Sequence, residues 1–144
     1  MENRMRLEFD AVSVNESFAR VAVSAFFAQL NPTVDEIEDV KTAVSEAVTN
    51  SIIHGYGEKE GTVVVTCTYH DKDSEVVVID EGVGIADIEK SMEPFFTTKP
   101  ELERSGMGFA FMEAFMDEVS VESEPLKGTK VTMKKRFGER KLEE

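Results

Sequence analysis

Three polar residues, Glu46, Asn50 and His54, recur every four positions within a segment of helical apolar periodicity. On an α-helix this spacing places their side chains on one stripe, about one turn apart. A carboxylate there can act as a general base, and an amide oxygen can ligate a hard cation that also holds phosphates. A solvated helix face, with the histidine acting only as a helix cap, is the alternative.

A second group of candidates is the segment Asp80-Glu81-Gly82-Val83-Gly84-Ile85, which directly follows a predicted strand. Gly82 and Gly84 allow a close approach of the backbone to a ligand, and Asp80 can accept hydrogen bonds from an exocyclic amine. The segment is not a Rossmann fingerprint, because the third glycine is missing and no helix follows directly. An ordinary Asp-Glu-Gly turn remains the alternative.

A third group, Ser105-Gly106-Met107-Gly108-Phe109, opens a predicted helix. Ser105 is a natural N-cap, and the glycines leave backbone N–H groups uncovered for an anion such as phosphate. Lys99 and Arg104 lie shortly before it and supply the positive charge that a triphosphate needs. A capped helix start beside solvated charges is the alternative interpretation.

The first half of the chain predicts one strand and two helices that would carry the first group. Leu7-Glu8-Phe9 alternates as a short strand does. Ser13-Val14-Asn15-Glu16 and the segment from Thr33 to Glu36 both match a capping box, so a helix should follow each. The first helix should end near Gln29, and the second should continue to Gly55, a C-cap candidate. The apolar stripes expected to be buried are Phe18, Val21, Ala22, Ala25, Phe26 and Leu30 in the first helix, and Ile37, Val40, Val44, Val48 and Ile52 in the second.

The second half of the chain predicts a hairpin and two further strands. The β-branched run from Gly61 to Tyr69 turns at residues 70–74 and returns from Glu75 to Ile79. Two more strands are expected at Glu118 to Ser123 and Thr129 to Lys135. Strands joined mostly by hairpins and interleaved with long helices predict an α/β two-layer sandwich, with a mixed, mostly antiparallel sheet covered on one face by helices.

Residues 85–105 carry no periodicity, which is typical of a functional lid or a disordered link. A helix is expected from Gly106 to Met116, and the charged tail at residues 137–144 should fray. A chain of 144 residues can form one self-sufficient core, so we expect a single domain over residues 1–144.

The formal charge of −13, from 29 acidic and 16 basic residues, repels phosphate backbones and anionic lipids. The balance disfavours direct nucleic-acid or membrane binding and favours a partner protein with basic surfaces. The single cysteine, Cys67, cannot form an intramolecular disulfide, and no signal or membrane-spanning segment is apparent, so a cytoplasmic location is expected. A P-loop enzyme, an ordinary protein kinase and a zinc hydrolase are disfavoured, because the GxxxxGK[ST], H-R-D, D-F-G and HExxH motifs are missing.

Taken in order, Glu46-x-x-x-Asn50, Asp80-x-Gly82-x-Gly84 and Gly106-x-Gly108 resemble the motifs of the GHKL ATPase superfamily. Within it the chain resembles the anti-sigma factor kinases of the sporulation, or sigma F, type over nearly its whole length. The most specific part of that resemblance is the segment from Phe96 to Gly108. The resemblance implies the GHKL (Bergerat) fold, with ATP or ADP and Mg²⁺ bound between the long helix, the glycine turns and the lid.

The resemblance also implies a role for each site residue. Glu46 would be the catalytic base, Arg104 would contact the γ-phosphate, Asn50 would ligate Mg²⁺ and Asp80 would hold the adenine amine. The other residues implied in nucleotide binding are Gly82, Gly84, Thr97, Thr98, Lys99, Ser105, Gly106, Met107, Gly108 and Thr129.

The resemblance further implies a homodimer that sequesters sigma F and phosphorylates a serine of an anti-anti-sigma protein. Arg20 would be a contact with the partner protein. Two departures from the family pattern are a short loop at residues 55–61 and Ala86 in place of a common proline. A general-stress type of anti-sigma kinase and a nucleotide-gated binding protein without kinase activity remain alternatives. A histidine-kinase catalytic domain is disfavoured, because no phosphoacceptor histidine precedes Glu46.

Overall fold

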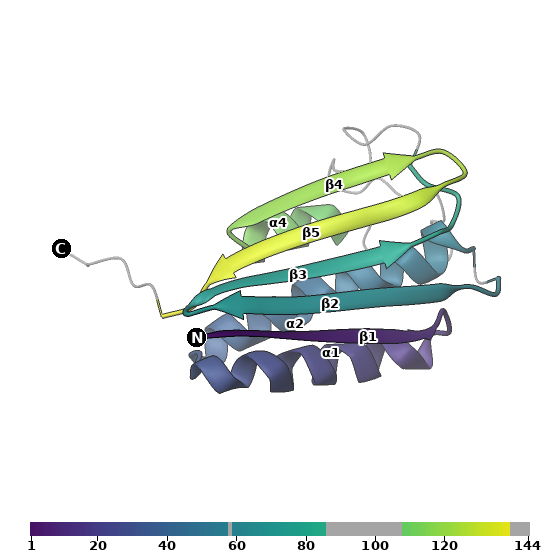
Figure 1. Ribbon diagram of the computed structural model, residues 1–144. Coiled ribbons are helices and arrows are strands. Elements are labelled where there is room, and N and C mark those ends of the chain that lie inside the picture. Colours follow the sequence, from purple (N-terminus) through teal and green to yellow (C-terminus); the bar gives the residue numbers. More distant parts are fainter. Residues whose placement is uncertain (58, 86–107, 139–144) are drawn as a thin grey trace.

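The computed structural model describes residues 1–57, 59–85 and 108–138 (Figure 1). In chain order its elements are β1 (Glu2–Asp10), α1 (Val14–Phe27), the 3₁₀ helix η1 (Ala28–Leu30), α2 (Val34–Asn50), the π-helical turn η2 (Ser51–Gly55), β2 (Thr62–His70), β3 (Asp73–Asp80), α4 (Gly108–Phe115), β4 (Glu118–Glu124) and β5 (Gly128–Arg136). The two-layer α/β architecture expected from the sequence is confirmed, since one sheet and one layer of helices make up the described part of the chain.

The sheet has five strands in the order β1-β2-β3-β5-β4. Every described pairing is antiparallel, although the sequence had left room for a parallel pair. The predicted hairpin is confirmed, with β2 and β3 joined through Asp71-Lys72. Strand β3 therefore occupies the centre of the sheet, and its last residue, Asp80, lies between neighbours on both sides.

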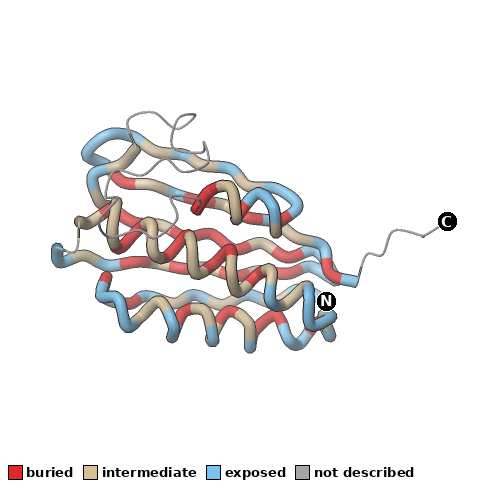
Figure 2. The backbone as a smooth tube through the Cα atoms, turned by 180° about the vertical axis from the view of Figure 1, so that it is seen from behind, coloured by how far each residue is buried: buried red, intermediate tan, exposed pale blue. Residues whose placement is uncertain are grey.

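The helices α1, α2 and α4 cover one face of the sheet (Figure 1). Burial alternates along the strands as a sheet with one covered face requires (Figure 2): Val63, Val65 and Cys67 of β2 are buried, while Val64 and Thr66 remain partly exposed. The thiol of Cys67 lies in this core, and burial raises its pKa to about 12. None of the described helices is long and apolar enough to cross a bilayer.

Helix α2 begins with the capping box predicted for it. The Thr33 hydroxyl accepts the N–H of Glu36 at 3.1 Å, and the Glu36 carboxylate accepts the N–H of Thr33 at 2.8 Å. Its predicted apolar stripe is buried, except for the partly buried Ile37. The helical segment ends at Gly55 as predicted, through the π-helical turn η2, but the C-cap is the next residue, Tyr56, whose N–H bonds to the Ser51 carbonyl at 3.0 Å.

Helix α1 departs from its prediction at both the cap and the buried face. Ser13 makes no capping bond, because its backbone is helical (φ −55, ψ −34) rather than in the extended conformation of an N-cap. The Glu16 carboxylate, the other half of the expected box, accepts the Ser45 hydroxyl of α2 at 2.5 Å. Phe18 and Val21, expected to be buried, are 54% and 61% exposed. The helix is apolar on two sides, and the side that packs inward carries Ala19, Val23, Phe26 and Phe27.

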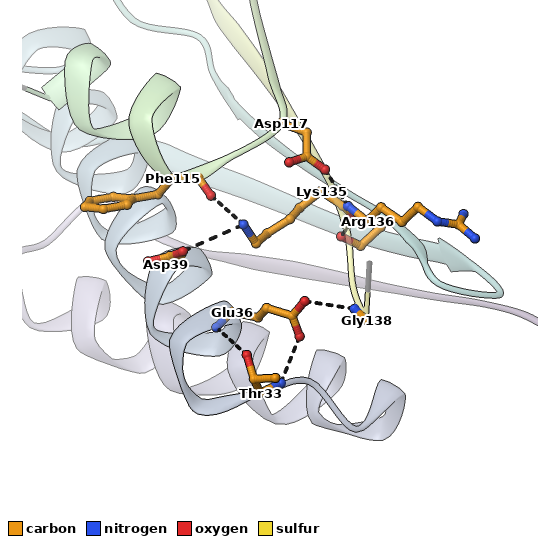
Figure 3. A network of polar contacts seen from close by, with 9 residues as sticks. Thr33, Glu36, Asp39, Phe115, Asp117, Lys135, Arg136 and Gly138 are labelled. Carbon is orange, nitrogen blue, oxygen red and sulfur yellow. Dashed lines mark hydrogen bonds and ion pairs between the residues drawn. The ribbon is translucent and has the colours of Figure 1, made fainter. Parts of the chain in front are cut away.

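Polar contacts tie the layers together at the end of the sheet where β5 finishes (Figure 3). The Lys135 ammonium donates to the Phe115 carbonyl at 2.8 Å and lies 3.8 Å from the Asp39 carboxylate. Gly138 donates its N–H to Glu36 at 2.8 Å. This group, which we call the β5-end network, joins the first half of α2 to the end of α4 and to β5.

Candidate functional site

Glu46 and Asn50 of α2 converge on the first described residue of α4. A Cβ atom built on Gly108 would lie 3.2 Å from Asn50 Nδ2 and 3.3 Å from Glu46 Oε1. Gly108 is therefore a point where the backbone of one helix approaches two polar side chains of another. His54 belongs to the π-helical turn, whose wider spacing does not continue the four-residue stripe.

The described part of α4 begins at this meeting point, at Gly108. The first turn of a helix carries N–H groups without intrahelical partners and a partial positive charge, which favour an anion. The Glu46 carboxylate and the Asn50 amide lie beside Gly108. A carboxylate, a neutral amide and the first described residues of α4 are thus gathered in one place.

Asp80 lies at the end of β3, only 4% exposed, beneath the end of the α2 and η2 segment. A Cβ on Gly55 would approach its carboxylate to 2.9 Å, which explains the glycine at that position. Burial raises the pKa of Asp80, while hydrogen bonds from the Gly82 N–H, Ser51 and the Thr129 N–H oppose that rise. The result is a buried acceptor held in a fixed orientation.

Ser51 is a site residue that the sequence prediction missed. It is 4% exposed and hydrogen-bonds to the Asp80 carboxylate from the π-helical turn. The available signal was its position, because a serine next to Ile52 interrupts an otherwise apolar face of the helix. Its hydroxyl supports the carboxylate from the helix layer.

The glycine turn after β3 packs directly against the π-helical turn. A Cβ on Gly82 would lie 2.0 Å from the Gly55 carbonyl oxygen, and the Val83 N–H bonds to that oxygen at 2.8 Å. Gly84 has φ +77, a conformation that L side chains rarely adopt. Both glycines are required by the close fit of this turn to its neighbours, beside Asp80.

Asp80, Thr129 and Ser123 are direct partners across three adjacent strands, β3, β5 and β4. The predicted residue Thr129 therefore lies next to Asp80, on the face covered by helices. Ser123 was not predicted, because its pairing depends on a strand register that no short motif encodes. We call these three residues the polar row.

Chemically, Asn50 and Glu46 offer one neutral and one anionic oxygen ligand. Within the described ranges, no group of three or more His, Cys, Asp or Glu residues is arranged to hold a metal ion. A cation at Asn50 would therefore take most of its ligands from phosphates and water. That pattern fits Mg²⁺, which keeps waters and binds through few protein ligands plus substrate phosphates.

Of the remaining predicted site residues, the structure describes only Arg20, which lies away from this cluster. Arg20 lies on α1, which packs on α2, and its Nε is 3.6 Å from the Glu16 carboxylate. Most of the predicted lid and the charged tail beyond Gly138 lie outside the described residues. The same holds for the site residues Thr97, Thr98, Lys99, Arg104, Ser105, Gly106 and Met107.

The sequence matches a family of histidine kinase-like ATPase domains over residues 8–135. An anti-sigma F factor of Clostridium acetobutylicum is 58% identical over 137 residues, covering 95% of this chain and 96% of that protein. The anti-sigma F factor of Clostridium botulinum (strain Eklund 17B) is 61% identical, with 94% and 96% covered. That of Bacillus subtilis is 56% identical over 142 residues, with 98% and 97% covered.

A similar fold occurs in the crystal structure of the RsbU and RsbW domains of a Mycobacterium tuberculosis protein. The TM-score is 0.67 at 21% sequence identity. The match covers 94% of this chain and 32% of that longer chain. At this identity the likeness concerns the fold alone.

Proposed function

We propose that this chain, which belongs to the histidine kinase-like ATPase family and within it to the anti-sigma F factors, is an ATP-dependent serine kinase that also sequesters its sigma factor. The phosphoryl acceptor is a serine of an anti-anti-sigma protein. The bound nucleotide is ATP or ADP with Mg²⁺. The observation that carries the proposal is the convergence of Glu46 and Asn50 on the start of α4, on the same side of the sheet as Asp80.

The nucleotide spans these two parts of the site. Asp80 and Thr129 receive the base, with Gly82 and Gly84 shaping the turn beside it. The phosphates extend toward Asn50 and the amides at Gly106 and Gly108, and Asn50 holds Mg²⁺. Lys99 and Arg104 supply positive charge to the phosphates. Thr97, Thr98, Ser105 and Met107 complete the assignment of nucleotide contacts.

Glu46 acts as the general base. It accepts the proton of the acceptor serine as the new bond from serine oxygen to γ-phosphorus forms and the bond to the β-γ bridging oxygen breaks, so that ADP leaves. Phosphoryl transfer depends mainly on positioning and charge stabilisation. Asn50 would hold Mg²⁺, which would supply positive charge to the phosphate oxygens, and Arg104 would contact the γ-phosphate.

Sigma-factor binding is assigned to α1. Val14, Phe18 and Val21 form an exposed apolar stripe on this helix, and Arg20 is 38% exposed next to it. An apolar surface with a charged neighbour is suited to a protein partner. The net charge of −13 favours a partner with basic regions. A homodimer, located in the cytoplasm, completes the proposal.

The test is transfer of labelled γ-phosphate from ATP with Mg²⁺ onto the matching anti-anti-sigma protein. We expect transfer by the wild type and a loss of about 10²- to 10⁴-fold in Glu46→Gln, because the variant lacks the base but keeps its shape. Glu46→Gln should still bind ADP. Asn50→Ala should lose both transfer and Mg²⁺-dependent nucleotide binding.

The outcome also separates the alternatives. Unchanged transfer by Glu46→Gln would remove the base assignment. Tight nucleotide and sigma-factor binding with no transfer by the wild type would leave a nucleotide-gated sequestering protein. Preference for a general-stress sigma factor over sigma F would favour the other paralogue, against the high identity to proteins named anti-sigma F factors.

A further inference from the structure

Ser123 is the outermost member of the polar row, and its hydroxyl has three close neighbours. The Ile85 N–H lies 2.7 Å from Ser123 Oγ, the Gly128 carbonyl oxygen lies 2.8 Å away, and Thr129 Oγ1 also lies 2.8 Å away. These contacts connect the glycine turn after β3 to the start of β5. One side chain therefore touches both structures that flank Asp80.

The hydrogen positions follow from counting donors and acceptors. A serine hydroxyl has one proton and two lone pairs. The Gly128 carbonyl can only accept, so it takes the Ser123 proton, and the Ile85 N–H occupies one Ser123 lone pair. The contact with Thr129 must then use the second lone pair, with Thr129 as the donor.

This arrangement fixes the polarity of Thr129. Because its one hydroxyl proton points to Ser123, Thr129 Oγ1 has only lone pairs to offer a ligand. Its neighbour in the row, the Asp80 carboxylate, also accepts hydrogen bonds, as its contact with the Gly82 N–H at 2.9 Å illustrates. The two residues thus present acceptors and no donor.

We propose that Ser123 is a specificity-determining positioning residue, which holds Thr129 as an acceptor so that the site selects a base with an amino group over one with a carbonyl oxygen in the same place. The inference rests on the proposed nucleotide site and adds a residue to its recognition of the base. A ligand carbonyl facing the row would meet only lone pairs. A site whose buried polar groups are left unpaired by the wrong ligand discriminates strongly against it.

The experiment measures the dissociation constants of ATP and inosine triphosphate, with Mg²⁺, by calorimetry. Inosine triphosphate carries a carbonyl oxygen where adenine carries its amine. In Ser123→Ala the Thr129 proton loses its fixed acceptor and can turn toward a ligand carbonyl. The preference for ATP should therefore fall about fivefold or more, the equivalent of one hydrogen bond.

Three further variants make the result specific. Ser120→Ala is the matched control, because Ser120 lies exposed on the opposite face of the same strand, and its preference for ATP should equal that of the wild type. Ser123→Thr keeps the hydroxyl and should retain the preference. Thr129→Val removes the acceptor at nearly constant shape, so it should weaken the preference even if Ser123→Ala does not fold.

Equal losses of affinity for both nucleotides in Ser123→Ala would indicate a purely structural role and overturn the inference. An unchanged preference in Thr129→Val would overturn it as well. Failure of the wild type to bind either nucleotide is a different result, because it rejects the proposed nucleotide site itself.

Discussion

Glu36 and Asp80 are carboxylates near opposite ends of the α2 and η2 segment, and their pKa values move in opposite directions. Burial acts to raise the pKa of Glu36, but hydrogen bonds from the Thr33 and Gly138 N–H groups outweigh it, and the net pKa is lowered. Burial dominates at Asp80, so its pKa is raised despite its hydrogen bonds. The carboxylate form is favoured at one end and disfavoured at the other.

The difference separates a part of the fold built for stability from a part suited to binding. In the β5-end network, charged groups meet complementary donors and acceptors within the protein (Figure 3). Around Asp80 and Gly108, acidic and amide side chains lie against glycines whose positions leave little room for a side chain, and burial outweighs the hydrogen bonds that Asp80 accepts. A buried carboxylate with a raised pKa is more common at functional sites than elsewhere in a protein.

Among the tests of this comparison between the two carboxylates, the largest effect is expected from Asp80→Asn, which should weaken ADP binding about 10- to 100-fold. The substitution keeps the shape but replaces a charged acceptor by a neutral amide, and hydrogen bonds to charged groups contribute about 1.5–3 kcal/mol. Calorimetric titration with ADP and Mg²⁺ measures it. An unchanged dissociation constant would contradict the assignment of Asp80 to nucleotide binding.

Lys135→Met should lower the free energy of unfolding by about 1.5–3 kcal/mol, since the 12% exposed side chain loses its bond to the Phe115 carbonyl and its contact with Asp39. ADP affinity should stay within about twofold. Urea unfolding gives the first quantity and calorimetry the second. Lys130→Met, at an exposed position of the same strand, is the control and should change stability by less than about 0.5 kcal/mol.

Gly108→Ala should slow phosphoryl transfer about tenfold while changing the free energy of unfolding by less than about 1 kcal/mol. The added methyl group presses on the ends of the Asn50 and Glu46 side chains, at 3.2 and 3.3 Å, and displaces them slightly. Transfer assays and urea unfolding on the same preparation check both parts. A large loss of stability with normal transfer would contradict the role given to this contact.

The smallest effect is a pH dependence. The lowered pKa of Glu36 contributes stability that is present above its unfolded pKa, about 4.3, and is lost as the pH falls through the folded value. The advantage of the wild type over Glu36→Gln in urea unfolding should therefore shrink on acidification. A stability difference that does not change with pH would contradict the lowered pKa of Glu36.

The stability difference between the wild type and Asp80→Asn should change with pH in the opposite direction. A raised folded pKa contributes stability below the unfolded pKa, about 3.9, and this contribution is lost as the pH rises through the folded value. Relative to this variant, the wild type should therefore lose stability as the pH rises. Slopes of the same sign in both variants would remove the contrast between the two carboxylates.

Features encoded within a few residues could be predicted from the sequence. The capping box at Thr33 and Glu36, the buried stripe of α2 and the hairpin of β2 and β3 all depend on local spacing. The same local reasoning failed for the capping box at Ser13, because the Ser13 backbone is helical and the Glu16 carboxylate bonds to Ser45 of α2, 29 residues away. It failed for Phe18 because a helix with two apolar sides does not reveal which one packs inward.

The residues of the candidate site also divide into those that a local motif predicts and those that only the assembled fold reveals. Glu46, Asn50, Asp80 and the glycines were found from motif spacing and family resemblance. Ser51 and Ser123 were missed because their partners are set by the π-helical turn and by the register of β4 on β5, which are properties of the assembled fold. Their roles became visible only as contacts to Asp80 and Thr129.

Hydrogen exchange of the backbone amides, with and without ADP and Mg²⁺, tests the contrast between the two ends most directly. For amides that exchange by local opening, the account predicts slower exchange on ADP binding at Gly82, Ile85 and Thr129. The amides of Glu36 and Gly138 in the β5-end network should exchange at unchanged rates. Protection confined to Glu36 and Gly138, with none beside Asp80, would contradict the account.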